Sequence, residues 1–156
     1  MWVFDDGGRS ETFQGETGDC VTRAIAIATG LPYRDVYRSL ADAYSDWLDN
    51  PRRSKRQTRT PSGAPRTASP RTGVPRAVYQ PFLESLGWEW HPTMRIGEGC
   101  TVHLTADELP SGTIICRVSK HMVTVIDGII HDTHDPSRDG TRCVYGYFQE
   151  QSWGNF

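Results

Sequence analysis

One segment restricts the possible folds of this chain more than any other: Cys20 to Thr29, which reads CVTRAIAIAT. Its apolar residues lie on most sides of the helix that the segment predicts, and no charged residue follows Arg23. A helix of this kind is normally buried at the centre of a domain. Gly30 stands where a glycine commonly ends a helix, so we expect a central helix over residues 20–29.

The elements on either side of this helix change character along the chain. Pro32 is expected to open an amphipathic second helix that reaches about Leu48. A third helix is expected over Ala77 to Leu86. Thr105 and Glu108 have the spacing of a capping box and predict a helical turn over 106–109. Strands are expected at 2–4, 113–119, 122–126, 129–133 and 143–148. Helices followed by an antiparallel sheet predict an α+β fold, and residues 1–156 fit one domain.

Composition narrows the class of protein. The net charge of −2 favours no particular partner, and the chain has neither an apolar run of membrane-spanning length nor a basic and apolar leader. The four cysteines form no CxxC pair, so we expect reduced thiols in a cytoplasm, with Cys100, Cys116 and Cys143 as structural thiols. We expect no membrane contact, no cofactor and no metal.

Positive charge is concentrated in residues 51–76. This segment holds eight basic residues, five prolines and no acidic residue. Removing its eight charges from the net −2 leaves the rest of the chain at about −10. Such dense proline blocks helix and sheet, which predicts a flexible insertion. A second possibility is an arm that binds an acidic partner or nucleic acid, for which the candidate residues are Arg52, Arg53, Lys55 and Arg56.

The β half of the chain contains a predicted hairpin that brings polar side chains together. Asp127-Gly128 is a strong signal for a two-residue turn, which pairs Ile126 with Ile129 and sets the register of both strands. Counting from that turn places His121, Asp132 and His134 on one face, with His121 and Asp132 as diagonal neighbours. An imidazole with a carboxylate behind it is the base and its orienting group in a nucleophilic triad.

The start of the central helix has features that activate a thiol. Unpaired N–H groups at a helix N-terminus favour negative charge and lower the pKa of a cysteine there, here Cys20. Gln14, six residues earlier, is a candidate amide donor to an oxyanion, a contact worth roughly 3–4 kcal/mol of activation barrier. Asp19 precedes Cys20, and its charge opposes thiolate formation unless its carboxylate caps the helix.

Four residues carry a resemblance to a known family: Gln14, Cys20, His121 and Asp132. Gln14-Gly15 followed by Cys20 resembles the papain-like cysteine peptidase superfamily, in which a glutamine six residues before the cysteine serves the oxyanion hole. A histidine opening one strand and an aspartate on the next, here His121 and Asp132, are similar to its bacteriocin-leader-processing branch. The wider pattern resembles short phage-encoded proteins of that fold. The resemblance implies a papain-like fold, a Cys20–His121–Asp132 triad and a protein or peptide substrate, in the host-cell cytoplasm if the protein is phage-encoded.

Two alternatives remain open. In one, His121, Asp132 and His134 form a metal site of two histidines and one carboxylate. In the other, the chain is a non-catalytic scaffold that binds a host factor or nucleic acid through its basic segment. The principal prediction is a cysteine peptidase or isopeptidase that acts through a thioester, and the same parts would also suit a deamidase or an acyltransferase.

Overall fold

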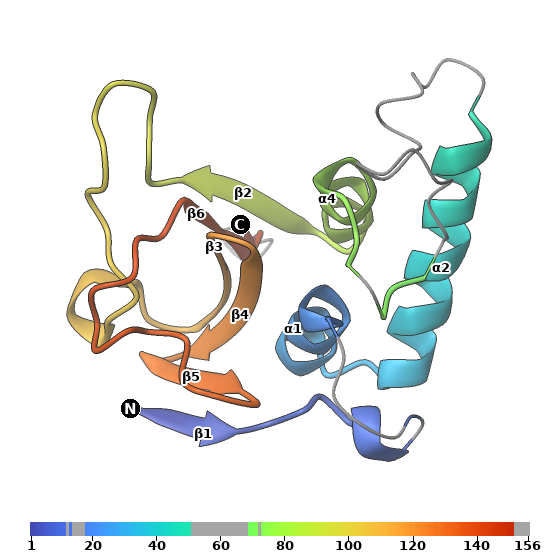
Figure 1. Ribbon diagram of the computed structural model, residues 1–156, viewed down its shortest axis with the longest axis horizontal. Helices are drawn as coiled ribbons and strands as arrows, with labels where there is room; N and C mark the ends of the chain where they lie inside the picture. The colour runs from blue at the N-terminus through green and yellow to red at the C-terminus, as the bar shows by residue number, and fades with distance from the viewer. Residues whose placement is uncertain (12, 14–17, 51–68, 72, 152–156) are drawn as a thin grey trace, which may run out of the picture.

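A computed structural model describes residues 1–11, 13, 18–50, 69–71 and 73–151. The described part contains three α-helices, two short 3-10 helices and one six-stranded sheet, so the predicted α+β class is confirmed. Figure 1 shows the α-helices gathered on one side of the molecule and the curved sheet on the other. The α-helices are α1 (Cys20–Thr29), α2 (Tyr33–Asp49) and α4 (Arg76–Ser85), and the 3-10 helices are η1 (Arg9–Glu11) and η2 (Ala106–Glu108).

Helix α1 has the bounds that its sequence predicts. It ends at Thr29 and is capped by Gly30, whose φ of 73° is left-handed and whose N–H donates to the carbonyl of Ala26. Glycine adopts this conformation without the steric strain of a Cβ atom. Pro32 then stands immediately before α2, where its fixed φ suits the entry to a helix.

The sheet is mixed, with one parallel pair at an edge. Its strand order is β1-β5-β4-β3-β6-β2, and only β1 and β5 run parallel. The predicted turn at Asp127-Gly128 is present, and Ile126 pairs with Ile129 as expected. The strands are β1 (Trp2–Phe4), β2 (Trp88–Pro92), β3 (Thr113–Val118), β4 (His121–Ile126), β5 (Ile129–Asp132) and β6 (Gly146–Glu150).

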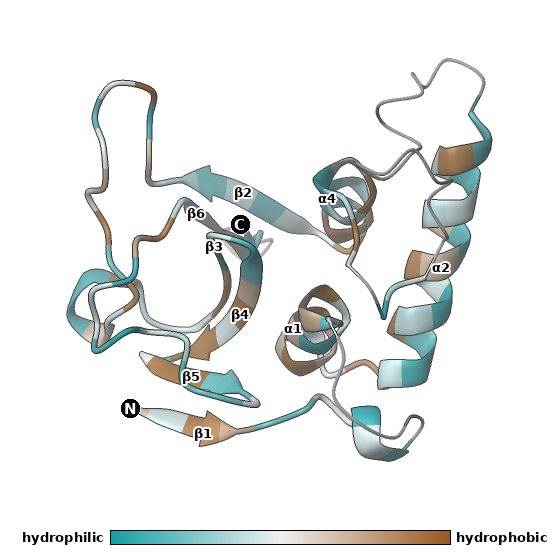
Figure 2. Ribbon diagram, in the orientation of Figure 1, coloured by the Kyte–Doolittle hydropathy of each residue, from teal (hydrophilic) through white to brown (hydrophobic). Residues whose placement is uncertain are grey.

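Two hydrophobic cores lie on opposite faces of this sheet. One packs α1, α2 and α4 against sheet residues that include Ile115, Met122 and Phe148. The other, around Cys116 and Val123, is covered by loop residues such as Leu104. Figure 2 shows hydrophobic residues over most of α1, as expected for the helix at the centre of the first core. The Thr124 hydroxyl donates to the carbonyl of Ala24 at 2.6 Å and so ties α1 to the sheet.

Strand β6 begins later than predicted, at Gly146 instead of Cys143. The preceding residues bond elsewhere: the N–H of Leu104 donates to the carbonyl of Arg142, and the N–H of Val144 donates to the carbonyl of Val102, both at 2.8 Å. The predicted helical turn is present as η2, but Thr105 makes no side-chain cap. The capping-box interpretation is therefore wrong.

The same contacts explain a cysteine pair that the sequence did not predict. Cys100 and Cys143 form a disulfide with their Cα atoms 5.8 Å apart, so reading both as structural thiols is wrong. They are 43 residues apart in the chain, and spacing alone does not reveal that two loops run side by side. Cys20 and Cys116 are free. Disulfides persist mainly in oxidising compartments, so this pair weighs against the predicted cytoplasmic location.

The end of the predicted basic insertion belongs to the fold. Val74 is buried in the first core, which packs the α-helices against the sheet, and α4 begins at Arg76. An apolar side chain followed by proline lets this stretch pack and start a helix. Arg52, Arg53, Lys55 and Arg56 lie outside the described residues. None of the helices in the described part of the chain combines the length and the apolar character needed to cross a bilayer.

Candidate active site

Cys20 is the first residue of α1 and is half-buried between that helix and the start of β4. Burial by itself would raise the pKa of the Cys20 thiol. The pKa is nevertheless lowered, because other groups outweigh burial. These groups are His121, through a hydrogen bond and its charge, the backbone amide of Met122 and the charge of Arg23. A thiolate at this position is therefore favoured by named partners as well as by the helix N-terminus.

His121 and Asp132 lie together at one end of the hairpin. His121 opens β4, Asp132 closes β5, and His121 Nε2 lies 2.6 Å from Asp132 Oδ2. Burial would lower the pKa of His121, but the hydrogen bonds to Asp132 and Cys20 raise it to about 9. Asp132 engages Nε2 and leaves Nδ1 as the other ring nitrogen. With its pKa raised to about 9, the ring is protonated at neutral pH.

The carboxylate of Asp132 is held from three directions. Burial would raise its pKa, but His121, the N–H of Thr133 and the charge of Arg23 hold that pKa below its usual range. Thr133 N donates to Oδ1 at 2.7 Å, and Arg23 Nη2 donates to the same oxygen at 3.2 Å. Asp132 therefore stays ionised and in a fixed orientation behind the imidazole.

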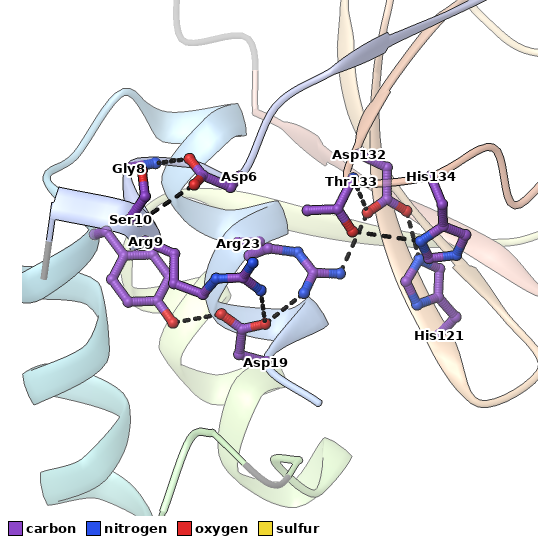
Figure 3. A network of polar contacts seen from close by, with 11 residues as sticks. Asp6, Gly8, Arg9, Ser10, Asp19, Arg23, His121, Asp132, Thr133 and His134 are labelled. Atoms are coloured by element: carbon purple, nitrogen blue, oxygen red, sulfur yellow. Dashed lines mark hydrogen bonds and ion pairs between the residues drawn. The ribbon is translucent and has the colours of Figure 1, made fainter. Parts of the chain in front are cut away.

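Figure 3 shows how Arg23 joins the hairpin to the start of α1. Its other terminal nitrogen pairs with Asp19, which also accepts from Arg9 Nη1 at 3.3 Å and from the Tyr33 hydroxyl at 2.5 Å. Asp19 is fully buried and makes no side-chain cap on α1. Its charge is compensated by the two arginines, so it need not cap the helix to coexist with a thiolate at Cys20.

His134 lies beside the pair, as the predicted register implies. Its ring centroid is 5.2 Å from that of His121. One ligand atom from each of His121, Asp132 and His134 lies within 4.8 Å of the others, a grouping with the donor types of a divalent-metal site.

The sequence-predicted triad residues are thus brought together, but Gln14 lies outside the described residues. Sequence reasoning missed Arg23 as part of the site. The signal was present: it is the one charged residue in an otherwise uncharged buried helix, and it follows Asp19 at the i, i+4 spacing that places two side chains on one helix face.

Comparison with known proteins supplies no relative. No family model matches the chain, and no curated protein or solved structure matches it. The functional argument therefore depends on the geometry of the site.

Proposed function

We propose that this protein is a papain-like cysteine hydrolase that cleaves a peptide or isopeptide bond through a Cys20 thioester. The observation that carries the proposal is the position of Cys20 in the same cavity wall as His121, whose Nε2 lies 2.6 Å from Asp132 Oδ2. The charge of His121 also helps to lower the pKa of Cys20. A nucleophile at the start of a central helix, facing a histidine and an aspartate on an antiparallel hairpin, is the arrangement that the superfamily resemblance implies. The α+β class is compatible with that fold.

The site's protonation states suit acyl transfer. Between the lowered pKa of Cys20 and the pKa of His121 at about 9, the pair exists as thiolate and imidazolium. The thiolate attacks the substrate carbonyl carbon, and the carbonyl π electrons move to oxygen. Collapse of this intermediate breaks the C–N bond, and the leaving amine takes the proton from His121.

Hydrolysis of the thioester completes the cycle. His121, now neutral, accepts a proton from water as the oxygen attacks the thioester carbon. The second intermediate expels the Cys20 thiolate, which releases the acid product and restores the ion pair. Asp132 holds the ring orientation and stabilises the imidazolium in both steps, and Arg23 holds Asp132.

Two other functions remain as alternatives. One is a non-catalytic scaffold that binds an acidic host factor or nucleic acid through the basic segment, residues 51–76. If the protein is phage-encoded, the hydrolase or the scaffold would act in the host cell. The grouping of His121, Asp132 and His134 favours a metal hydrolase as a second enzyme candidate. That candidate leaves the lowered pKa of Cys20 without a role, so we prefer the thiol mechanism.

One digestion experiment tests the proposal. The full-length protein is incubated with a peptide library, and new N-termini are identified by mass spectrometry. We expect cleavage that survives EDTA and is lost after treatment with iodoacetamide. The Cys20→Ala variant should be inactive, and the His91→Ala variant, altered at a histidine outside the site, should keep activity. Cleavage that EDTA abolishes and iodoacetamide spares would support the metal enzyme, and no cleavage would favour the scaffold.

A further inference from the structure

A small cavity opens directly beside the candidate nucleophile. Its volume is about 290 Å³, and Cys20 and His121 form part of its wall. The start of α4, the end of β3 and the turn that follows β3 form much of the rest, through residues such as Arg76, Tyr79, Arg117 and Lys120. Ligand sites usually span roughly 300–1,000 Å³, so this cavity suits one or two residues of a substrate.

Apart from the Cys20 thiolate, the charged side chains in the described part of this cavity wall are cationic. Arg76, Arg117 and Lys120 are cationic, and the described residues of the wall include no aspartate or glutamate. Within the described ranges, no carboxylate lies at ion-pair distance from any of these three side chains. Arg76 is instead held by neutral groups: its Nε donates to Gln80 at 2.6 Å, and its guanidinium lies 4.5 Å from the centre of the Trp90 ring. Its charge therefore remains available to a ligand.

Tyr79 lies in the same wall, and its buried hydroxyl has no hydrogen-bond partner among the described residues. Tyr79 is only 4% exposed, and no group in the described part of the chain hydrogen-bonds its hydroxyl. Burial raises the pKa of Tyr79, while the charges of Arg117 and Arg76 act to lower it and that of Cys20 to raise it. The tyrosine is therefore a neutral donor at pH 7 and lies close enough to both arginines and to Cys20 to sense their charges. Leaving such a donor unpaired is unfavourable, so a ligand that accepts from it has an advantage.

We propose that this cavity binds a carboxylate of the substrate next to the scissile bond, through Arg117, Arg76 and the Tyr79 hydroxyl. The inference rests on the proposed function and adds to it a substrate class, peptides with an acidic group at the cleavage point. A guanidinium matches a carboxylate in geometry and charge, and a neutral phenol supplies a further donor. The carboxylate can come from an aspartate or glutamate side chain or from a peptide C-terminus.

Binding can be measured without relying on catalysis. The full-length protein is titrated, with NMR detection, with N-acetylglutamate α-amide, N-acetylglutamine and N-acetylglutamine α-amide. The first compound has only a side-chain carboxylate, the second only a terminal one, and the third is neutral. We expect saturable shifts at Tyr79 and Arg117 with at least one of the two acids, at an affinity about tenfold or more above that of the neutral amide. The preferred acid identifies the source of the carboxylate.

Variants then locate the binding. Arg117→Gln is expected to weaken the preferred acid by about tenfold, and Tyr79→Phe by a smaller factor without loss of packing. Arg38→Gln removes the same charge from the exposed side of α2 and should leave binding unchanged. Equal affinity of all three compounds for the wild-type protein would overturn the proposal, as would an equal loss of binding in Arg117→Gln and Arg38→Gln.

A matched pair of alkylating agents gives a second readout. Iodoacetate and iodoacetamide differ in one carboxylate, and their rates with the unfolded protein provide the reference ratio. In the folded protein we expect iodoacetate to label Cys20 about tenfold faster relative to that reference, and Arg117→Gln to remove the preference. An unchanged ratio would overturn the carboxylate site. Slow labelling of Cys20 by iodoacetamide would instead count against the proposed function. The NMR titration does not depend on a reactive thiol, so it still tests the carboxylate site in that case.

Discussion

The two free cysteines of this protein occupy opposite kinds of position. Cys20 is at the first turn of α1 and is half-buried, whereas Cys116 is in the middle of β3 and fully buried. Burial raises the pKa of Cys116 to about 12. Burial acts in the same direction on Cys20, yet its pKa falls because His121, the Met122 amide and Arg23 favour the thiolate.

The difference comes from what each element leaves unpaired. Cys116 pairs with Val123 on one side and Tyr147 on the other, so the sheet ladders engage the backbone around it and leave no donor for a thiolate. A helix N-terminus has unpaired N–H groups by construction, and α1 begins where the β4–β5 hairpin presents His121. A thiol in this protein is therefore activated by the polar partners at the end of an element, against the effect of burial.

The largest expected effect is the contrast in labelling between these two thiols. In native protein at pH 7, iodoacetamide should label Cys20 more than about a thousandfold faster than Cys116, because a thiol with a pKa near 12 is almost never ionised. Peptide mass mapping of timed samples measures both rates. Protein unfolded in guanidinium provides the control, since the two thiols should then react alike. Similar rates in the folded protein would contradict the comparison.

The next effect sharpens the comparison on the Cys20 side. Arg23→Gln leaves Asp19 and Asp132 as buried carboxylates without their shared guanidinium, and breaking a buried ion pair typically costs about 3–5 kcal/mol. We expect the free energy of unfolding in urea to fall by about 3 kcal/mol. Arg38→Gln on the exposed side of α2 is the matched control and should change it little. A loss in Arg23→Gln as small as that of the control would show that Arg23 does not join the two halves of the site.

The smallest effect separates the histidine from the helix N-terminus as a source of activation. His121→Ala should raise the pKa of Cys20 and slow its labelling at pH 7 by about tenfold, because burial then acts with less opposition. In the wild type, thiolate is present above the lowered pKa of Cys20 and imidazolium below about pH 9. Hydrolysis should therefore decline above about pH 9.

Labelling rates across pH 5 to 10 check the predicted change in the pKa of Cys20, with His91→Ala as the control. Peptide-cleavage rates across the same range check the predicted decline in hydrolysis. His91 stacks on Tyr147 outside the site, so its removal should leave the profile of Cys20 unchanged. An unaltered profile in His121→Ala would assign the activation to the helix N-terminus, the Met122 amide and Arg23. Cys116 should remain unreactive in every variant.

Local pattern was enough to predict much of this molecule. Helix α1, the turn at Asp127-Gly128 and the register that follows from it depend on hydrophobic period and backbone preference over a few residues. Once that register is known, the proximity of His121 and Asp132 follows by counting. Cys20 was identified because its position at a helix start is itself a local feature. These parts of the candidate site were therefore accessible from the sequence.

The tertiary structure decided how these local pieces meet. Arg23 and Asp132 are separated by 109 residues, and Cys100 and Cys143 by 43. Arg76, predicted as part of a flexible insertion, instead lines the cavity beside Cys20. Periodicity determines which face of an element is apolar, but not which other element covers it. The contacts that tune the thiol and shape its neighbouring cavity arise only when α1, α4 and the hairpin pack together. Each of these elements contributes some of the charged groups, and no single segment contains them all.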